Sequence, residues 1–408
     1  MPSPDRGRPL PTWRANPAGP PPPANDDAAG FRGAVSGIGR GALRPGNPRS
    51  HGLVPETGGT NPDSGPLLCR RERASGGWRA DGDNFGQPRG GGPADGSRFD
   101  LAVPPGGYAW WYLDAVSDDG RNALTIIGFV GSVFSPYYTF ARRNKPVPAE
   151  NHVALNVALY GEKRGWAMTE RGASALDRDR DRLVIGPSAM RWEGCDLVIS
   201  VQEWGFPLPR RLVGEIRVTP QVWGGQAFVL NEQGQHLWHP VSPLASVRLD
   251  FERPDLSWRG TGYLDHNRGD RPIAEGFEDW NWQRAAHENG ALVAYSGTRR
   301  DGRNFGFCVD FGRDGVEMEQ VLPPAQMLPR TLWRVPRIAH GEAGTKLLKT
   351  LEDTPFYSRS IIEMAHMGRR LEAVQESLSL THLTRPVVQA MLPFRMPRRG
   401  WSIRPPVG

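Results

Sequence analysis

The sequence predicts an all-β protein, a barrel or sandwich of antiparallel strands followed by one or two helices. Beyond residue 100, apolar and polar residues alternate in segment after segment, which is the pattern of strands with one buried face. These segments recur roughly every 10 to 15 residues, with Gly, Pro or Asp between them. Many short strands of this kind in one chain are typical of β-barrels and β-sandwiches.

The first 97 residues of the 408-residue chain are predicted to be disordered. They are rich in Pro, Gly, Arg and Asp, as in "GPPPPANDDAAG", and contain almost no periodic apolar residues. Such a segment cannot bury enough apolar surface to offset the entropy lost on ordering. The remaining residues are enough for a sizeable core.

Strands are expected along most of the folded part. In "HVALNVALYG", for example, Val153, Leu155 and Val157 share one face. A turn at Asp301-Gly302 predicts a hairpin over 291–315. The other expected strands are 122–134, 152–161, 181–192, 196–205, 212–223 and 246–254.

From residue 341 the apolar spacing changes. Leu347, Leu348 and Leu351 follow a helical spacing, and Pro355 interrupts it, so we expect one or two helices packed on the β-structure. The predicted organisation is a disordered segment 1–97, β-domains 98–235 and 236–340, a helical segment 341–384 and a basic tail 385–408.

The charge distribution argues against a nucleic-acid binder. The formal net charge is +6, but residues 1–97 hold twelve Arg or Lys against nine Asp or Glu, and residues 385–408 hold five Arg and no acid. The folded middle is therefore slightly acidic rather than basic. A solvated tail is the simpler interpretation of the C-terminus, yet its mixture of Arg, Trp and apolar residues also suits shallow contact with an anionic membrane.

We expect a cytoplasmic protein, because no run of 18 apolar residues and no secretory signal is present. The C-terminal tail adds the expectation of peripheral association with the inner or photosynthetic membrane. No metal or cofactor is expected. The cysteines form no CxxC or CxxxH arrangement, and His236 and His239, three apart on a strand, would point to opposite faces.

Two segments combine into a candidate site. Residues two apart on a strand share a face, so His236 and Trp238 in "HLWH" would point the same way, as would Tyr263 and Asp265 in "TGYLDH". The intervening sequence is long enough for a strand pair that brings both segments to one barrel mouth. Each residue also has a simpler explanation: core packing for the Trp, a backbone hydrogen bond for the His, and turn chemistry for an Asp beside Asn and Gly.

The fourteen tryptophans exceed what a plain β-core needs and favour an aromatic-lined cavity. Candidate lining residues are Trp110 and Trp111 in "GGYAWWYLD" and Trp280 and Trp282 in "EDWNWQ". Barrel mouths are common sites for apolar ligands.

Several long segments resemble the acyclic carotenoid 1,2-hydratases, also called hydroxyneurosporene synthases, of carotenoid-producing bacteria. They include "GGYAWWYLDAVSDDGRNALTIIGFVGSVFSPYY", "GPSAMRW", "LEDTPFYSRS" and "MLPFRMPRR", and the similarity runs from Phe99 to Arg399. The resemblance implies two lipocalin-like halves. It also implies a hydratase that adds water to the terminal double bond of acyclic carotenoids such as neurosporene and lycopene.

The same resemblance points to His236, Trp238, Tyr263 and Asp265 as the active-site set, with Asp265 as proton donor. Hydrating such an olefin requires a protonated acid, and burial in an apolar pocket can keep a carboxyl protonated. Ring faces of Trp238 and Tyr263 would stabilise the carbocation, and His236 would either hold Asp265 or position the water. The alternative is a lipocalin-like carrier that binds a polyene or lipid unchanged.

Overall fold

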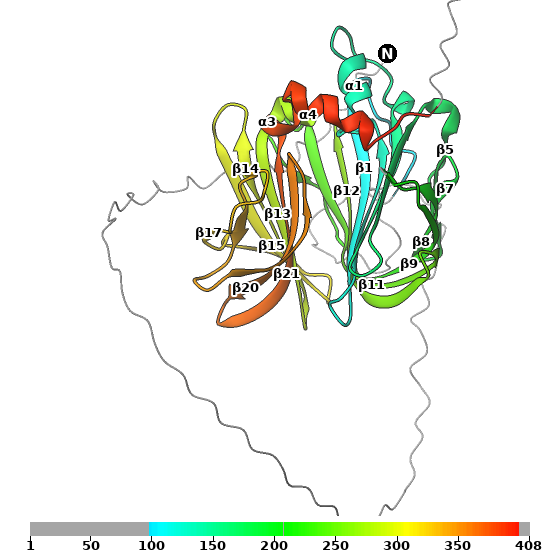
Figure 1. Ribbon diagram of the computed structural model, residues 1–408. Coiled ribbons are helices and arrows are strands. Elements are labelled where there is room, and N and C mark those ends of the chain that lie inside the picture. Colours follow the sequence, from blue (N-terminus) through cyan, green and yellow to red (C-terminus); the bar gives the residue numbers. More distant parts are fainter. Residues whose placement is uncertain (1–97, 207, 400–408) are drawn as a thin grey trace, which may run out of the picture. The chain divides into compact units, whose positions relative to one another are not determined.

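The computed structural model describes residues 98–206 and 208–399 (Figure 1). They form three antiparallel sheets and a few short helices, so the all-β prediction is confirmed. The predicted disordered segment, 1–97, and the last residues of the basic tail lie outside the described residues.

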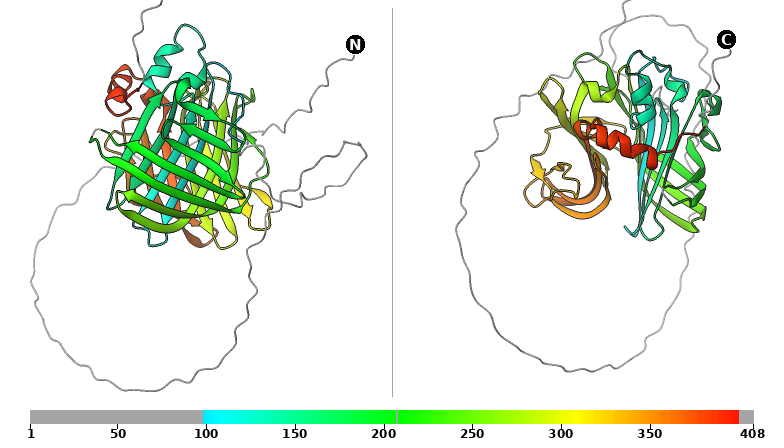
Figure 2. Two further views of the ribbon diagram at one scale, coloured as in Figure 1. Left: turned by 90° about the vertical axis from the view of Figure 1, so that its right-hand side faces the viewer. Right: turned by 45° about the horizontal axis from the view of Figure 1, so that its top comes forward.

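The first sheet has twelve strands and curls into a nearly closed barrel (Figure 2). Its strand order is β4-β3-β2-β1-β12-β11-β9-β8-β7-β6-β5, with β10 paired to β11. The strands are β1 (Tyr108–Ser117), β2 (Ala123–Val130), β3 (Val153–Tyr160), β4 (Gly165–Arg171), β5 (Leu176–Arg178), β6 (Arg182–Ile185), β7 (Ser188–Glu193), β8 (Asp196–Trp204), β9 (Arg211–Val222), β10 (Phe228–Val229), β11 (His236–Arg253) and β12 (Leu256–Gly269).

The second sheet has seven strands in the order β16-β15-β14-β13-β21-β20-β19, and β17 and β18 form a small sheet of their own. The strands are β13 (Phe277–His287), β14 (Gly290–Arg299), β15 (Asn304–Gly312), β16 (Glu317–Gln320), β17 (Ala325–Met327), β18 (Ile338–His340), β19 (Lys346–Asp353), β20 (Tyr357–His366) and β21 (Arg369–Ser379).

The helices are all short. They are α1 (Pro136–Ala141), α2 (Ile273–Gly276), α3 (Leu380–Leu383) and α4 (Pro386–Met391), with 3-10 turns η2 (Ala149–Asn151), η3 (Ala173–Ala175) and η4 (Leu392–Phe394). In Figure 1 and in the right-hand view of Figure 2, α4, drawn in red, lies across the region where the two large sheets meet. No helix among the described residues is long and apolar enough to cross a membrane.

Strand β1 is buried on both faces because it contributes to two cores. Trp110 and Tyr112 belong to the hydrophobic cluster that also contains residues of the second sheet. Trp111 and Leu113, one position away, belong to the cluster formed within the first sheet. Successive side chains on a strand point to opposite faces, so this alternation sorts the aromatic residues of β1 between the two cores.

The helical prediction for 341–384 is wrong: β19, β20 and β21 occupy most of it, and only Leu380–Leu383 is helical there. For β19 the cause is irregular pairing with β20, because the register shifts between Leu347 and Lys349 and again between Thr350 and Glu352. Such bulges break strict alternation and leave apolar residues at spacings that resemble those of a helix.

The predicted boundary at residue 236 is also displaced. Both β11 and β12 pair within the first sheet, with β12 beside β1, and the chain enters the second sheet only at β13. By contrast, the predicted hairpin at Asp301-Gly302 is confirmed, because β14 and β15 pair on either side of it. Gly302 has φ +78°, a backbone conformation that favours glycine.

Candidate active site

A cavity of about 310 Å³ lies between the two large sheets. Its walls are mostly aromatic and apolar, and its polar groups include the carboxyls of Asp265 and Glu376. The first sheet contributes Trp110, Tyr112, Ile127, Phe129, Trp166, Met168, Asp265 and Asn267 among others, and the second sheet contributes Trp280, Trp282, Tyr295, Tyr357, Glu376 and Leu378. The expectation of a site at a barrel mouth is therefore corrected, since Asp265 faces the gap between the sheets.

The C-terminal segment closes one side of this cavity. Val388 of α4, Leu392 of η4 and Met396 are buried and line it. Arg395 also lines the cavity, lying 4.4 Å from the ring centroid of Trp166 and 3.5 Å from Glu352 of β19. The residues expected to form a solvated tail thus include part of the cavity wall.

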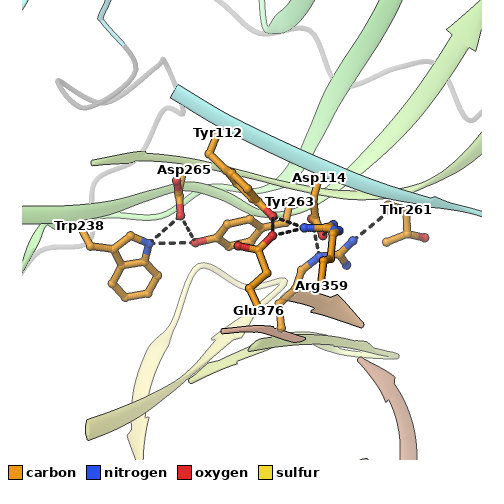
Figure 3. Close-up of polar contacts among 9 residues, drawn as sticks. Tyr112, Asp114, Trp238, Thr261, Tyr263, Asp265, Arg359 and Glu376 are labelled. Carbon is orange, nitrogen blue, oxygen red and sulfur yellow. Dashed lines mark hydrogen bonds and ion pairs between the residues drawn. The ribbon is translucent and has the colours of Figure 1, made fainter. Parts of the chain in front are cut away.

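Asp265 is held by three neutral hydrogen-bond donors. Trp238 Nε1 donates to Asp265 Oδ2 at 3.0 Å, Tyr263 Oη donates to the same oxygen at 2.9 Å, and Asn267 Nδ2 donates to Oδ1 at 3.0 Å. Trp238 Nε1 also lies 2.9 Å from Tyr263 Oη, so these three side chains form a closed triangle (Figure 3). Strand periodicity and the pairing of β11 with β12 bring them together, as the sequence predicted.

Burial controls the charge of Asp265. The side chain is only 3% exposed, and this burial raises the pKa of the carboxyl to about 8, against the lowering effect of the hydrogen bonds from Tyr263 and Trp238. The negative charges of Glu376 and Asp114 raise it further. Asp265 is therefore mostly protonated near neutral pH, which is the state that a general acid requires.

Trp238 and Tyr263 contact Asp265 rather than the cavity. Both are 0% exposed, and neither is among the lining residues. The expectation that their ring faces meet the substrate therefore needs correction. The aromatic rings that line the cavity with Asp265 include those of Tyr112, Trp282 and Tyr295.

His236 lies on the predicted face but does not reach Asp265. Its Nδ1 is 2.9 Å from the hydroxyl of Tyr108, and its ring packs on Phe277. A Cβ atom at Gly276 would lie 2.7 Å from His236 Nε2, so the ring is tightly enclosed. Burial lowers the pKa of His236 to about 4, which keeps the ring neutral at pH 7.

Three of the four predicted lining tryptophans are found on the cavity wall: Trp110, Trp280 and Trp282. Trp111 is not, and its prediction is wrong. As the neighbour of Trp110 on β1 it points to the opposite face, where its ring stacks on His266 with centroids 4.8 Å apart. Only alternate residues of "AWWY" can face one cavity.

Sequence reasoning missed Tyr112, Glu376 and Arg359. The Tyr112 hydroxyl donates to Glu376 Oε1 at 2.6 Å, and Arg359 Nη1 contacts the same oxygen. Period-2 alternation from Trp110 could have identified Tyr112. Nothing local marks Glu376 in "QESLSL", because its neighbours come from β13 and β20, far away in the sequence.

Within residues 98–206 and 208–399, no group of three or more His, Cys, Asp or Glu side chains is arranged to hold a metal ion.

Comparison with known proteins identifies the family. The family model "Carotenoid hydratase CrtC" matches residues 126–404. The chain belongs to the CrtC family. It is 47% identical to the acyclic carotenoid 1,2-hydratase of Thiocapsa roseopersicina over 92% of this chain and 93% of that protein. It is 44% identical to the acyclic carotenoid 1,2-hydratase of Rubrivivax gelatinosus over 92% of this chain and 94% of that protein.

Solved structures that are similar to this chain include the crystal structure of an AttH candidate from Nitrosomonas europaea. It has a TM-score of 0.47 and 14% identity, and the match covers 67% of this chain and 92% of that one.

Proposed function

We propose that this CrtC-family protein adds water across the terminal C-1,2 double bond of acyclic carotenoids such as neurosporene and lycopene, giving 1-hydroxy carotenoids. The relatives named above support the reaction. The observation that carries the proposal is a buried carboxyl, Asp265, whose pKa of about 8 keeps it protonated on the wall of an aromatic cavity.

Asp265 supplies the proton in the first step. The π electrons of the terminal double bond form a C–H bond at the less substituted carbon, the O–H bond of Asp265 breaks, and a tertiary carbocation remains. A carboxyl with the ordinary pKa of about 3.9 would be protonated only about once in a thousand at pH 7. Burial removes most of this penalty of about 4 kcal/mol, because each pKa unit is equivalent to about 1.4 kcal/mol.

The cavity stabilises the carbocation without trapping it. The rings of Tyr112, Trp282 and Tyr295 line the same space as Asp265, and a cation above a desolvated aromatic ring gains on the order of 2 kcal/mol. Aromatic carbons form no stable adduct with the cation, whereas an exposed amine could. Water then attacks the cation and gives the tertiary alcohol.

The size of the cavity suits one end of a long substrate. A volume of about 310 Å³ is at the lower end of the range of about 300 to 1,000 Å³ for ligand pockets. A polyene would therefore enter with its terminal isoprenoid unit towards Asp265, and the rest of the chain would extend out of the cavity.

A substrate this insoluble is best collected from a lipid bilayer, and α4 with η4 supplies the surface. Val387 and Phe394 are exposed by 64 and 75%, Met391 is 43% exposed and also lines the cavity, and Val388 and Leu392 of the same segment line it as well. Arg385 adds positive charge beside these apolar groups, as expected of a segment that lies on an anionic membrane. We propose that the protein is cytoplasmic and associates peripherally with the inner or photosynthetic membrane.

Incubation of the purified full-length protein with lycopene in detergent micelles tests the function. Mass spectrometry should detect a product heavier by one water molecule, with the hydroxyl at C-1. Binding of lycopene without any change in mass, at a protein concentration that saturates binding, would instead identify a carrier.

A further inference from the structure

A cluster of four charged side chains lies next to Asp265. Arg359 Nη2 is 2.6 Å from Asp114 Oδ2, and Arg284 Nε is 2.7 Å from Asp114 Oδ1. Arg359 also contacts Glu376, which accepts a hydrogen bond from Tyr112 (Figure 3). Asp114 and Arg359 are 0% exposed, so their charges must be compensated within the cluster. Two guanidinium groups are balanced only if both carboxyls are ionised.

Of the four charged residues in this cluster, Glu376 is the one that lines the cavity. It lines the wall together with Tyr112 and Asp265, whereas Asp114, Arg284 and Arg359 do not. Its direct partners in the second sheet are Arg359 on β20 and Trp282 on β13.

The cavity therefore contains two carboxyls in different environments. Asp265 is buried among the neutral side chains of Trp238, Tyr263 and Asn267, and burial without a cationic partner favours its protonated form, although the hydrogen bonds from Tyr263 and Trp238 act in the opposite direction. Burial raises the pKa of Glu376 as well, but Glu376 is paired with the guanidinium of Arg359, which lowers it, and Asp265 has no such cationic partner. The geometry therefore favours Glu376 as the ionised member of the pair, and two carboxyls in unlike environments are the usual arrangement of an acid and a base in one site.

We propose that Glu376 is a second catalytic residue, the base that accepts the proton of the attacking water. This assignment depends on the hydratase function proposed above. A lone pair of the water oxygen forms the C–O bond to the tertiary cation, an O–H bond of the resulting oxonium breaks, and the proton passes to the Glu376 carboxylate. Tyr112 and Arg359 both bind Oε1, and Tyr357 also hydrogen-bonds to this carboxyl.

Trp282 supplies the donor that would hold this water. Its indole Nε1 is buried and has no hydrogen-bond partner among the described residues, and Trp282 both lines the cavity and pairs directly with Glu376. Buried donors in native proteins are nearly always satisfied by protein or by ordered water. A water molecule that accepts from Trp282 Nε1 and donates to Glu376 satisfies this N–H and directs its lone pair towards the cation.

The catalytic cycle closes without an external proton donor. After product formation Asp265 is ionised among neutral partners and Glu376 is protonated beside a guanidinium, the reverse of the starting state. Transfer of one proton from Glu376 to Asp265 through a second cavity water restores both. Tyr112 lies between them, because it is the register partner of Asp265 on β12 and hydrogen-bonds to Glu376.

Carrying out the reaction in D₂O separates the role of Asp265 as acid from the role of Glu376 as base. In the wild-type enzyme, water captures most of the cations. In Glu376→Gln, Asp265 still delivers a deuteron, but a cation that is not captured loses a proton from the same carbon to the Asp265 carboxylate and returns to a deuterated alkene. We expect hydration to fall by about 100-fold or more, the usual range for loss of a general base. Deuterium incorporation into recovered lycopene should persist within tenfold. Asp265→Asn should abolish both.

Two further variants test whether the effect of Glu376→Gln comes only from a disturbed fold. Glu376→Asp keeps the cluster neutral but withdraws the carboxylate, and it should raise the ratio of exchange to hydration in the same way. Glu203→Gln is the matched control, because Glu203 is a buried carboxylate paired with Arg171 at 2.7 Å and does not line the cavity. It should leave that ratio unchanged.

The possible outcomes are distinct. If exchange and hydration fall by the same factor in both Glu376 variants, Glu376 is only structural and the assignment is wrong. A wild-type protein that gives neither hydrated product nor deuterated lycopene would instead refute the hydratase function itself.

Discussion

Tyr112 and Asp265 are direct partners across the antiparallel register of β1 and β12. This pairing puts a phenol that hydrogen-bonds to Glu376 beside the carboxyl that is held by Trp238 and Tyr263. Two polar networks, one neutral and one charged, thus meet at a single pair of residues on the cavity wall.

Asp265→Asn should abolish hydration while leaving the fold intact. The side chain keeps its shape, and the amide oxygen can still accept from Tyr263, but no acidic proton remains. We expect a loss of at least about 10³-fold in product formation from lycopene, together with an unchanged circular dichroism spectrum. Substantial activity in this variant would assign the acid to another residue.

Hydration should decline as the pH rises through about 8, because only protonated Asp265 can act and its pKa is about 8. The same shift affects stability. The folded state holds this proton far more tightly than the unfolded chain, so the contribution of the group to stability is complete below about pH 4 and is lost as the pH rises towards 8. Rate profiles and urea unfolding from pH 5 to 9 would measure both effects, and Asp265→Asn should lack this contribution to the stability change.

Tyr263→Phe should move the alkaline limb of the activity profile to higher pH. The Tyr263 hydroxyl donates to Asp265 and lowers the pKa of its carboxyl, so removing it favours the protonated form. The maximal rate should fall because Asp265 is less well positioned. A limb at unchanged pH would mean that the hydroxyl does not interact with the ionised carboxylate.

His236→Ala should lower stability through packing rather than through proton transfer. It empties an enclosed site and leaves the buried Tyr108 hydroxyl without its partner, which should cost about 1 to 3 kcal/mol of unfolding free energy. His236→Gln can restore a hydrogen bond to Tyr108 and should recover part of this loss. Neither wild type nor variant should show a histidine titration in activity between pH 5 and 7, since His236 is already neutral there.

The double substitution of Val387 and Phe394 by Ser should weaken binding to anionic liposomes several-fold in a flotation assay. Each removes an exposed apolar side chain from the segment that covers the cavity. Met367→Ser is the matched control, because Met367 is 74% exposed but lies in the turn between β20 and β21. If wild type, the double variant and Met367→Ser bound anionic liposomes equally well, α4 and η4 would not be the membrane contact.

The Asp265 site was predictable because its members lie on two neighbouring strands. Period-2 alternation is enough to align Trp238 with Tyr263 and Asp265 once β11 and β12 pair. The same rule, applied to β1, would have placed Trp110 and Trp111 on opposite faces of the strand.

The opposite wall was not predictable from one sequence. Glu376 reaches the site only because β21 packs across from β1, and no local pattern specifies which faces of two sheets meet. Strand β19 was missed because its bulged pairing disturbs the alternation from which strands are recognised. Strand β20 is buried at most positions, so its apolar residues do not alternate with polar ones.

The division of the cavity between two sheets has a consequence for synthesis on the ribosome. The first sheet is complete at Gly269, but its aromatic outer face is covered only after β21 ends at Ser379. At about 5 to 20 residues per second, the nascent chain exposes that face for roughly 5 to 20 seconds. During this interval Trp238 and Tyr263 lie on an uncovered apolar surface, so a chain that stops near Gly269 should be bound by chaperones or aggregate.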